Sequence, residues 1–337
     1  MKGYYFLQSL NRLIKSHRVK FLAILLCRLM GIRYISLRVD PAISCNLSCL
    51  MCSYSSSQDK GKRFTDEEMN RLLDDFLPLS LQAVVGCGYE PTMYKGFTDI
   101  IRRASENGVP YTGVTTNGQL LKKEQIESLI RSKLSEIIIS MHGVHKDTYE
   151  QLMPGASHER LHEVLGMIDR TKEEMRSDLP RLRVNFAVNS RNLPEIKDFF
   201  DEFGKYNIQT LNFRPMFGSE FPGGLMSDAD VETYRGLIGE FQVLCSKREM
   251  TLVANISDEK YSKASAAAII FPEILYHMIP TIVWREDFNW KSETYRDFCK
   301  RIGYTRYLIK CMFSSTDTLL SDKRMKRFRS SGRYDVI

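Results

Sequence analysis

Between residues 34 and 213 the sequence alternates six short runs of β-forming residues with segments of helical periodicity. The runs cover residues 34–39, 81–85, 111–116, 134–140, 182–188 and 208–213. Most of them are apolar, which is typical of parallel strands that are buried on both faces. Repeated β–α units form right-handed crossovers and therefore a parallel sheet. The pattern predicts an α/β fold of six units, either an open barrel or a doubly wound sheet.

The segments between the runs carry helix signals. Thr65 and Glu68 form a capping box ahead of apolar residues at helical spacing, which predicts a helix start. Asn192 with Glu195 predicts the start of another helix in the same way. Further helices are predicted around residues 97–104, 126–130, 158–176 and 228–248, and a strand over 251–256. The alternation of strand and helix patterns begins at residue 34 and weakens after residue 213. We therefore divide the chain into an N-terminal segment (1–33), a core domain (34–220) and a mainly helical C-terminal extension (221–337).

The net charge of +7 is concentrated at the two ends of the chain. Residues 1–38 hold eight Lys or Arg and no acidic residue, and residues 321–337 hold six basic and two acidic residues. The body between them is acidic, which argues against a nucleic-acid substrate because such enzymes place positive charge around the cleft. We interpret residues 1–33 as a basic amphipathic helical segment that covers the barrel, with contact to a membrane surface or a partner left open.

No apolar run is long enough for a membrane-spanning helix, because the longest one near the N-terminus, residues 21–27, ends at Arg28. The eight cysteines do not form the pattern of a secreted disulfide framework. These features predict a cytoplasmic protein.

Three cysteines directly follow the first predicted strand. Cys45, Cys49 and Cys52 have the spacing CxxxCxxC, and the next cysteine or histidine in the sequence is Cys87. Three thiolates on one loop indicate a soft metal centre, either zinc or an iron–sulfur cluster. Structural zinc requires four protein ligands, so three cysteines favour a cubane cluster with one open iron. The alternative is that the three cysteines are unrelated thiols that bind no metal.

This motif, with the bulky Met51 before its last cysteine, resembles that of the radical S-adenosylmethionine (radical SAM) superfamily. The resemblance implies a partial (β/α)6 TIM-like barrel and a [4Fe–4S] cluster on the three cysteines. In that family S-adenosylmethionine chelates the open iron and is cleaved reductively to a 5′-deoxyadenosyl radical, which abstracts hydrogen from substrate. The chain resembles the branch with SPASM and molybdopterin-like members. A complete SPASM extension is not expected, since the C-terminal region offers only Cys245, Cys299 and Cys311.

Further elements at the predicted strand ends support the resemblance. The resemblance implies cofactor contacts for Met51, Gly88, Glu90, Thr116, Asn117, Ser140 and Asn185. Gly88 and Glu90 are similar to the Gly-Gly-Glu element that binds the methionyl ammonium, although Tyr89 separates them. Thr116 and Asn117 belong to a threonine-asparagine-glycine turn, which by itself is an ordinary turn. Ser140 is the last residue of the fourth predicted strand, and Asn185 lies on the fifth. For both residues a purely structural role stays open.

The resemblance implies an enzyme that acts on a peptide or a small metabolite and receives electrons from a donor such as flavodoxin or ferredoxin. The alternative is a non-catalytic iron–sulfur or zinc protein in electron transfer or regulation. Glu90 and the Thr116–Asn117 turn favour the enzyme, because an electron carrier needs no cradle for a second cofactor. The sequence leaves the substrate and the net reaction open.

Overall fold

The computed structural model of the chain describes residues 14–52, 54, 57–216, 226–254, 269–328 and 335–336. These residues contain one sheet with the strand order β10-β7-β6-β5-β4-β3-β2-β1-β8-β9. The strands are β1 (Ile35–Val39), β2 (Ser80–Val85), β3 (Tyr111–Thr116), β4 (Glu136–Met141), β5 (Arg181–Val188), β6 (Ile208–Pro215), β7 (Thr251–Ala254), β8 (Leu275–Ile279), β9 (Ile282–Val283) and β10 (Asp335–Val336). The first six are the six predicted runs.

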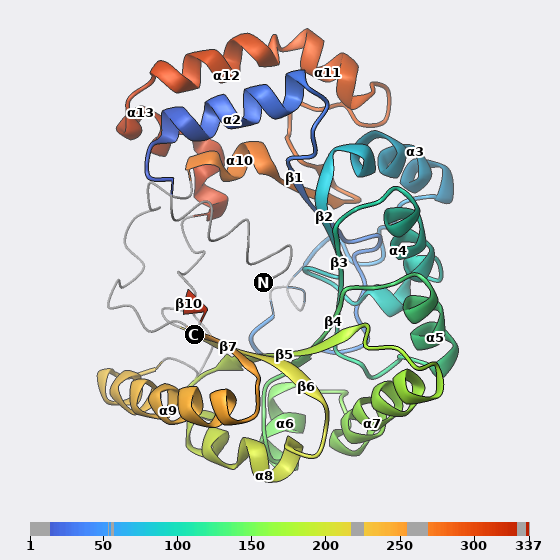
Figure 1. The fold of residues 1–337 in the computed structure, drawn as a ribbon, viewed down its shortest axis with the longest axis vertical. Helices are drawn as coiled ribbons and strands as arrows, with labels where there is room; N and C mark the ends of the chain where they lie inside the picture. The colour runs from blue at the N-terminus through green and yellow to red at the C-terminus, as the bar shows by residue number, and fades with distance from the viewer. Residues whose placement is uncertain are drawn as a thin grey trace.

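The described helices lie on the outer side of this curled sheet (Figure 1). They are α2 (His17–Leu29), α3 (Asp66–Phe76), α4 (Phe97–Glu106), α5 (Lys123–Arg131), α6 (Lys146–Leu152), α7 (His158–Glu174), α8 (Phe199–Phe203), α9 (Asp228–Lys247), α10 (Phe271–Ile274), α11 (Tyr295–Arg301), α12 (Tyr304–Phe313) and α13 (Thr316–Leu320). β1 to β7 pair in parallel, and the two edges of the sheet do not pair with each other. The predicted α/β fold is therefore an unclosed barrel.

Alternation along the strands decides which side chains face the helices and which face inward. In β1, Leu37 and Val39 are fully buried in the outer core, whereas Arg38 between them is exposed on the inner face. In β6, Leu211 and Phe213 are fully buried in the same core, and Arg214 is exposed. The outer apolar layer thus packs against helices, and the inner face of the sheet carries polar groups.

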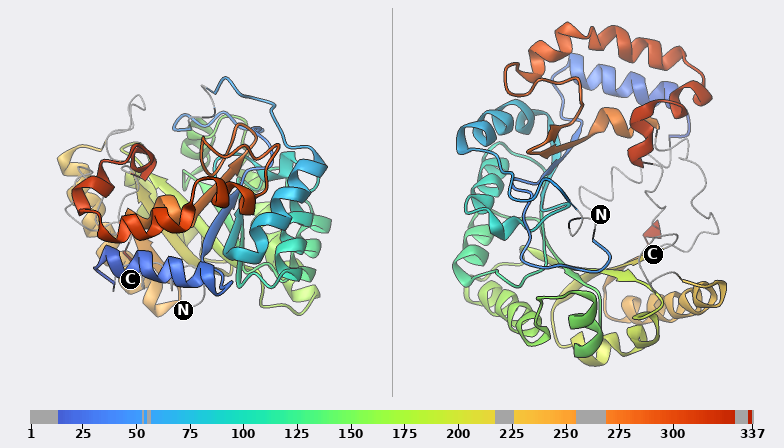
Figure 2. Two further views of the ribbon diagram at one scale, coloured as in Figure 1. Left: turned by 90° about the horizontal axis from the view of Figure 1, so that it is seen from above. Right: turned by 180° about the vertical axis from the view of Figure 1, so that it is seen from behind.

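Two strands from outside the predicted core domain join the same sheet. β7 pairs in parallel with β6, and β8 pairs in parallel with β1. Figure 2 shows α2 from the N-terminal segment beside α12 from the C-terminal region. The C-terminal region therefore extends the sheet at both edges, with β7 and β10 at one and β8 and β9 at the other. Residues 1–13 and 255–256, which the sequence assigns to a helical segment and a strand, lie outside the described residues.

The predicted capping box is confirmed at Thr65, whereas at Asn192 a helix starts as predicted but without the capping hydrogen bonds. Thr65 Oγ1 accepts a hydrogen bond from Glu68 N, and the Glu68 carboxylate accepts one from Thr65 N, so the capping box is confirmed. The Glu195 carboxylate instead accepts from the backbone N–H of Val144 and of a neighbouring residue, and the Asn192 side chain bonds elsewhere. A 3₁₀ helix, η4 (Leu193–Asp198), starts at this position.

None of the helices in the described part of the chain has the length and apolar character needed to cross a lipid bilayer.

Candidate functional site

The three predicted metal-ligating cysteines lie on the loop between β1 and α3, at the carboxyl end of the sheet. Each of them is half-buried and free of disulfide bonds. Cys45 Sγ accepts a hydrogen bond from Leu47 N at 3.4 Å, and Cys52 Sγ accepts one from Tyr54 N at 3.4 Å. Amide hydrogen bonds of this kind stabilise negative charge on sulfur. Desolvation, Cys52 and Cys45 together raise the pKa of Cys49 to about 12.

The spacing of the three sulfur atoms suits a cluster better than a single ion. Within the described residues, three ligand atoms lie within 4.8 Å of one another only at His158, His162 and Glu202, so at least one pair of the three cysteine sulfurs is more than 4.8 Å apart. Tetrahedral zinc would hold two thiolates about 3.8 Å from each other, given its Zn–S bond of roughly 2.3 Å. In a cubane cluster each cysteine binds a different iron, which requires wider spacing. This spacing therefore favours a cluster over a single zinc ion held by all three cysteines.

The predicted cofactor residues Glu90, Thr116 and Asn117 meet in one buried hydrogen-bond network. Glu90 is 4% exposed. Its Oε1 accepts from Thr116 Oγ1 at 2.6 Å and from both the hydroxyl and the amide of Thr92, at 2.7 and 3.2 Å. Its Oε2 accepts from Asn117 N at 2.8 Å. Desolvation raises the pKa of Glu90, and these donors oppose that shift. Glu90 therefore ties the loop after β2 to the turn after β3.

Asn117 connects this network to the cysteine loop. Its Nδ2 donates to Asn46 Oδ1 at 3.0 Å and lies 3.9 Å from Cys45 Sγ. The Asn117 and Thr116 side chains are nearly fully buried. The turn predicted from sequence thus acts as a bridge between two loops, rather than as an isolated reversal of the chain.

Replacing Glu90 by alanine should lower the stability of the protein. The substitution leaves buried hydroxyl and amide donors of Thr92, Thr116 and Asn117 without their acceptor. We expect the free energy of unfolding to fall by about 3 kcal/mol, since each buried donor left unpaired costs about 1–3 kcal/mol and the hydroxyls can reorient. Urea denaturation would measure this loss in the free energy of unfolding. The control is Glu124→Ala on α5, which removes an exposed carboxylate and should leave the urea midpoint unchanged. A midpoint of Glu90→Ala equal to that of the native protein would contradict the network.

Sequence analysis missed a second buried carboxylate, Asp40 at the end of β1. Asp40 is fully buried and accepts hydrogen bonds from the backbone N–H of Cys87, Gly88 and Tyr89 at 2.8 to 3.3 Å. His277 on β8 reaches it with a 2.6 Å contact between Nε2 and Oδ2. Asp40 therefore binds the backbone amides of the loop after β2, and His277 on β8 contacts Asp40 in turn.

Glycine is required at one position in this loop. Gly86 has a φ of +83°, and a Cβ there would lie 2.2 Å from the carbonyl oxygen of Thr115. Any side chain would therefore displace the backbone of β3. At Gly88, in contrast, a Cβ would approach only the Asp40 carboxylate, at 3.3 Å. Gly86 therefore lets the loop after β2 pass close to the backbone of β3.

The inner face of the sheet is closed at its amino end by paired polar groups. Arg183 and Glu136 form an ion pair of 2.6 Å and are 5% and 4% exposed. The Tyr111 hydroxyl donates to the same Glu136 carboxylate at 2.5 Å. The cation and the hydroxyl both bind the Glu136 carboxylate, so these side chains form a structural contact between β3, β4 and β5.

The middle of the inner face carries the predicted residues Asn185 and Ser140, which are register partners on β5 and β4. Asn185 Oδ1 accepts a hydrogen bond from Asn212 Nδ2 at 3.0 Å. Asn212 Oδ1 is buried and has no partner among the described residues. Both Asn185 and Ser140 are half-buried, so they lie where a bound molecule on the inner face could reach them.

Two exposed arginines lie nearer the carboxyl end of the inner face. They are Arg38 on β1 and Arg214 on β6, and both lie close enough to the exposed Cys87 for their charges to act on its thiol. Burial lowers the pKa of His142 to about 4, to which Arg214 contributes. His142 Nδ1 accepts from Ala187 N, so its Nε2 carries the proton. These side chains give the inner face an excess of positive charge and donors.

The remaining predicted sites are placed as follows. Met51 is half-buried on the cysteine loop, next to Cys52. Cys245, Cys299 and Cys311 are buried on α9, α11 and α12. Because α9 lies at the opposite end of the sheet from α11 and α12 (Figure 1), the three cannot ligate one cluster.

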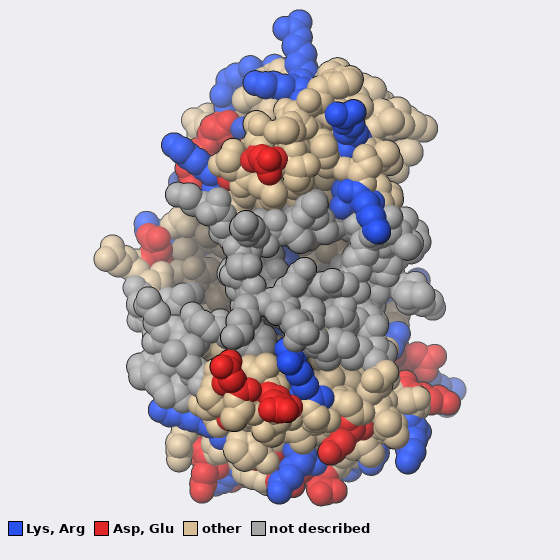
Figure 3. Space-filling model, turned by 90° about the vertical axis from the view of Figure 1, so that its left-hand side faces the viewer, with Lys and Arg blue, Asp and Glu red and all other residues tan. Residues whose placement is uncertain are grey.

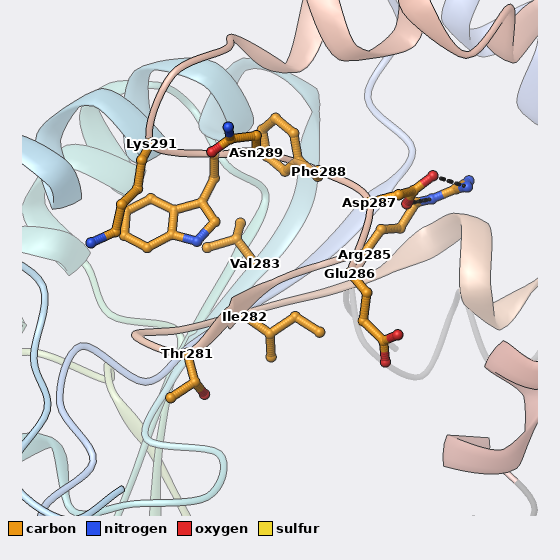
Figure 4. Close-up of a pocket in the computed structure, with 10 residues that line it drawn as sticks. Thr281, Ile282, Val283, Arg285, Glu286, Asp287, Phe288, Asn289 and Lys291 are labelled. Atoms are coloured by element: carbon orange, nitrogen blue, oxygen red, sulfur yellow. Dashed lines mark hydrogen bonds and ion pairs between the residues drawn. The ribbon is translucent and has the colours of Figure 1, made fainter.

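A pocket of about 370 Å³ lies in the loop between β9 and α11. Figure 4 shows the Arg285–Asp287 ion pair on one side of it and Thr281 and Ile282 on another. All of its lining residues come from residues 281–291, and none of the sequence-predicted residues lines it. We therefore place the candidate site at the cysteine loop.

Comparison with known proteins gives related sequences for part of the chain. Residues 41–174 match the profile of the Radical SAM superfamily. Probable GTP 3′,8-cyclase of Thermoplasma volcanium is 26% identical over 174 residues, which cover 51% of this chain and 51% of that protein. PqqA peptide cyclase of Bradyrhizobium diazoefficiens is 28% identical over 155 residues, covering 46% of this chain and 39% of that protein. The match thus spans about half the length of the cyclase from Thermoplasma, and less of PqqA peptide cyclase.

Solved structures resemble the chain over a longer stretch. SuiB of Streptococcus suis bound to S-adenosylmethionine has a TM-score of 0.61 at 16% identity, covering 88% of this chain and 68% of that one. The protein anSMEcpe with bound AdoMet and Cp18Cys peptide has a TM-score of 0.58 at 13% identity, covering 87% of both chains. These likenesses confirm the fold expected from the sequence, a partial α/β barrel.

Proposed function

The chain belongs to the radical SAM superfamily, and we propose that it is an enzyme that binds a [4Fe–4S] cluster and S-adenosylmethionine and removes hydrogen from a substrate on the inner face of the sheet. The observation that carries this proposal is the loop of Cys45, Cys49 and Cys52, three half-buried free thiols that lie beside the Glu90–Asn117 network. When bound, the two cofactors supply reductive cleavage that generates a 5′-deoxyadenosyl radical.

The residues of this chain would hold and orient the cofactors. The three cysteines bind the cluster, and Leu47 N, Tyr54 N and Asn117 Nδ2 donate toward its sulfur ligands. Glu90 Oε2 has one hydrogen bond, whereas a carboxylate oxygen accepts about two, so a lone pair is available to the methionyl ammonium. Gly88, Ser140, Asn185 and Met51 complete the proposed cofactor contacts.

We propose a peptide or a small metabolite as the substrate. Sequence relatives include enzymes named for both, PqqA peptide cyclase and GTP 3′,8-cyclase. Arg38 and Arg214, exposed on the inner face, favour a substrate with a carboxylate or phosphate group. The reducing electron would come from a donor such as flavodoxin or ferredoxin.

Reductive cleavage of S-adenosylmethionine tests the proposed enzyme directly. Protein reconstituted anaerobically with iron and sulfide and reduced with dithionite should form 5′-deoxyadenosine and methionine, even slowly without substrate. Chromatography of the products measures this, and the same protein without dithionite is the control. Full iron loading with no 5′-deoxyadenosine would contradict the proposal and would favour an electron carrier.

A further inference from the structure

The outward face of α2 is apolar, which is unusual for a helix at the surface. Its exposed large side chains are Val19, Leu22, Leu26 and Leu29, at the spacing of one helix face. Its buried face contains Phe21, Ile24 and Leu25. Surface helices normally turn polar residues outward and bury one apolar stripe. α2 therefore has two apolar faces, and described residues cover only one of them.

The neighbouring helix α12 extends this apolar surface. Phe313 is 74% exposed and Ile309 is 41% exposed. Figure 2 shows, in the view from above, that α2 and α12 lie side by side with no described element over them. We define the α2/α12 face as Val19, Leu22, Leu26, Leu29, Met30, Ile32, Ile309 and Phe313. Eight of the thirteen exposed large apolar side chains of the described residues belong to it, so the surface is concentrated rather than scattered.

The charges on the same two helices have one sign. Arg18, Arg306 and Lys310 are exposed on them and Lys15 is exposed just before α2, and none of the four forms an ion pair with a described residue. Neither α2 nor α12 contains Asp or Glu. Figure 3 shows Lys and Arg side chains projecting from the top of the molecule, where these helices lie. An apolar strip flanked by cations is the pattern of a helix that lies in a membrane interface.

We propose that the α2/α12 face binds the surface of an anionic lipid bilayer, with its apolar side chains at the headgroup boundary and its lysines and arginines on the lipid headgroups. The positive charge beside the α2/α12 face favours an anionic bilayer over a second copy of the chain. A second copy of the chain would bring two basic faces together, and like charges disfavour that contact. Anionic headgroups instead attract each basic side chain with about 1 kcal/mol, equivalent to about fivefold in affinity.

Vesicle flotation with the full chain tests this proposal without any cofactor. The protein should bind phosphatidylcholine vesicles that contain phosphatidylglycerol, and binding should weaken as salt is added. Leu26→Glu with Leu29→Glu should reduce partitioning about thirtyfold or more, because it removes apolar contact and adds repulsion from anionic lipid. Val243→Glu with Leu244→Glu on α9 is the matched control, since both side chains are exposed there, and it should change partitioning less than about twofold.

The charge requirement is tested separately. Arg18→Gln with Lys310→Gln should weaken vesicle binding about 25-fold, from about fivefold for each charge. Circular dichroism melts would check that each variant folds. The proposal is overturned if the native protein does not float with anionic vesicles, or binds neutral vesicles equally well. It is also overturned if sedimentation shows that the two glutamates dissociate a dimer, because the face would then be an interface between copies.

Discussion

Simultaneous replacement of Cys45, Cys49 and Cys52 by alanine is expected to abolish iron binding. The reconstituted native protein should contain about four iron and four sulfide per chain, and the triple variant less than about a tenth of that. The physical reason is that the three cysteines are the proposed protein ligands and the loop offers no replacement thiolate. Colorimetric iron and acid-labile sulfide analysis would measure both quantities.

The matched control for this result is Cys27→Ala on α2, which removes an equally half-buried thiol and should leave the iron content unchanged. Stoichiometric zinc without iron in the native protein would exclude the cluster. A content of about eight iron per chain would instead indicate a second cluster. It could not combine Cys245 with Cys299 and Cys311, since these lie at opposite ends of the sheet.

Replacing Asp40 by alanine is expected to destabilise the protein by about 3–5 kcal/mol. The fully buried carboxylate accepts three backbone N–H groups from the loop after β2 and contacts His277. Its removal leaves several buried donors without an acceptor, and breaking a buried pair on one side carries a penalty of this size. Chemical denaturation measures the loss, and hydrogen exchange should show faster exchange of the amides of Cys87, Gly88 and Tyr89.

His277→Ala provides the comparison that identifies the role of Asp40. The His277 side chain is 40% exposed, and its loss leaves the three amide donors with their carboxylate. We therefore expect a smaller loss of stability and nearly native exchange of the loop amides. Equal exchange rates in Asp40→Ala and in the native protein would show that the carboxylate does not hold the loop.

The part of the fold that could be predicted from sequence rests on local patterns. The buried runs of β1 to β6 are apolar enough to be strands wherever they occur, and alternation with helices restricts their arrangement to a parallel sheet. Thr65 could be assigned as a cap because its partner Glu68 is three residues away. The spacing of the cysteines is equally local, so their loop could be identified as one ligand set.

Features that depend on distant contacts could not be predicted in this way. Nothing near Asp40 in the sequence points to His277, which meets it through the pairing of β1 with β8. The strand β8 could not be predicted either, because Pro272 interrupts the apolar stretch that leads into it. Glu195 has the spacing of a capping residue, but the amides beyond β4 compete successfully for its carboxylate. Tertiary contacts decided each of these positions.

The pairing of β1 with β8 also affects the order in which the chain can fold during synthesis. Leu37 leaves the ribosome early, whereas its partner Tyr276 is made only after most of the chain. Until then β1 is an edge strand, exposed to pairing with other chains on the side that β8 later covers. Such long-range pairing also slows folding, because the loop must close before the contact forms. The strand that precedes the cysteine loop therefore gains its second neighbour late in synthesis, and Asp40 gains its contact with His277 at the same stage.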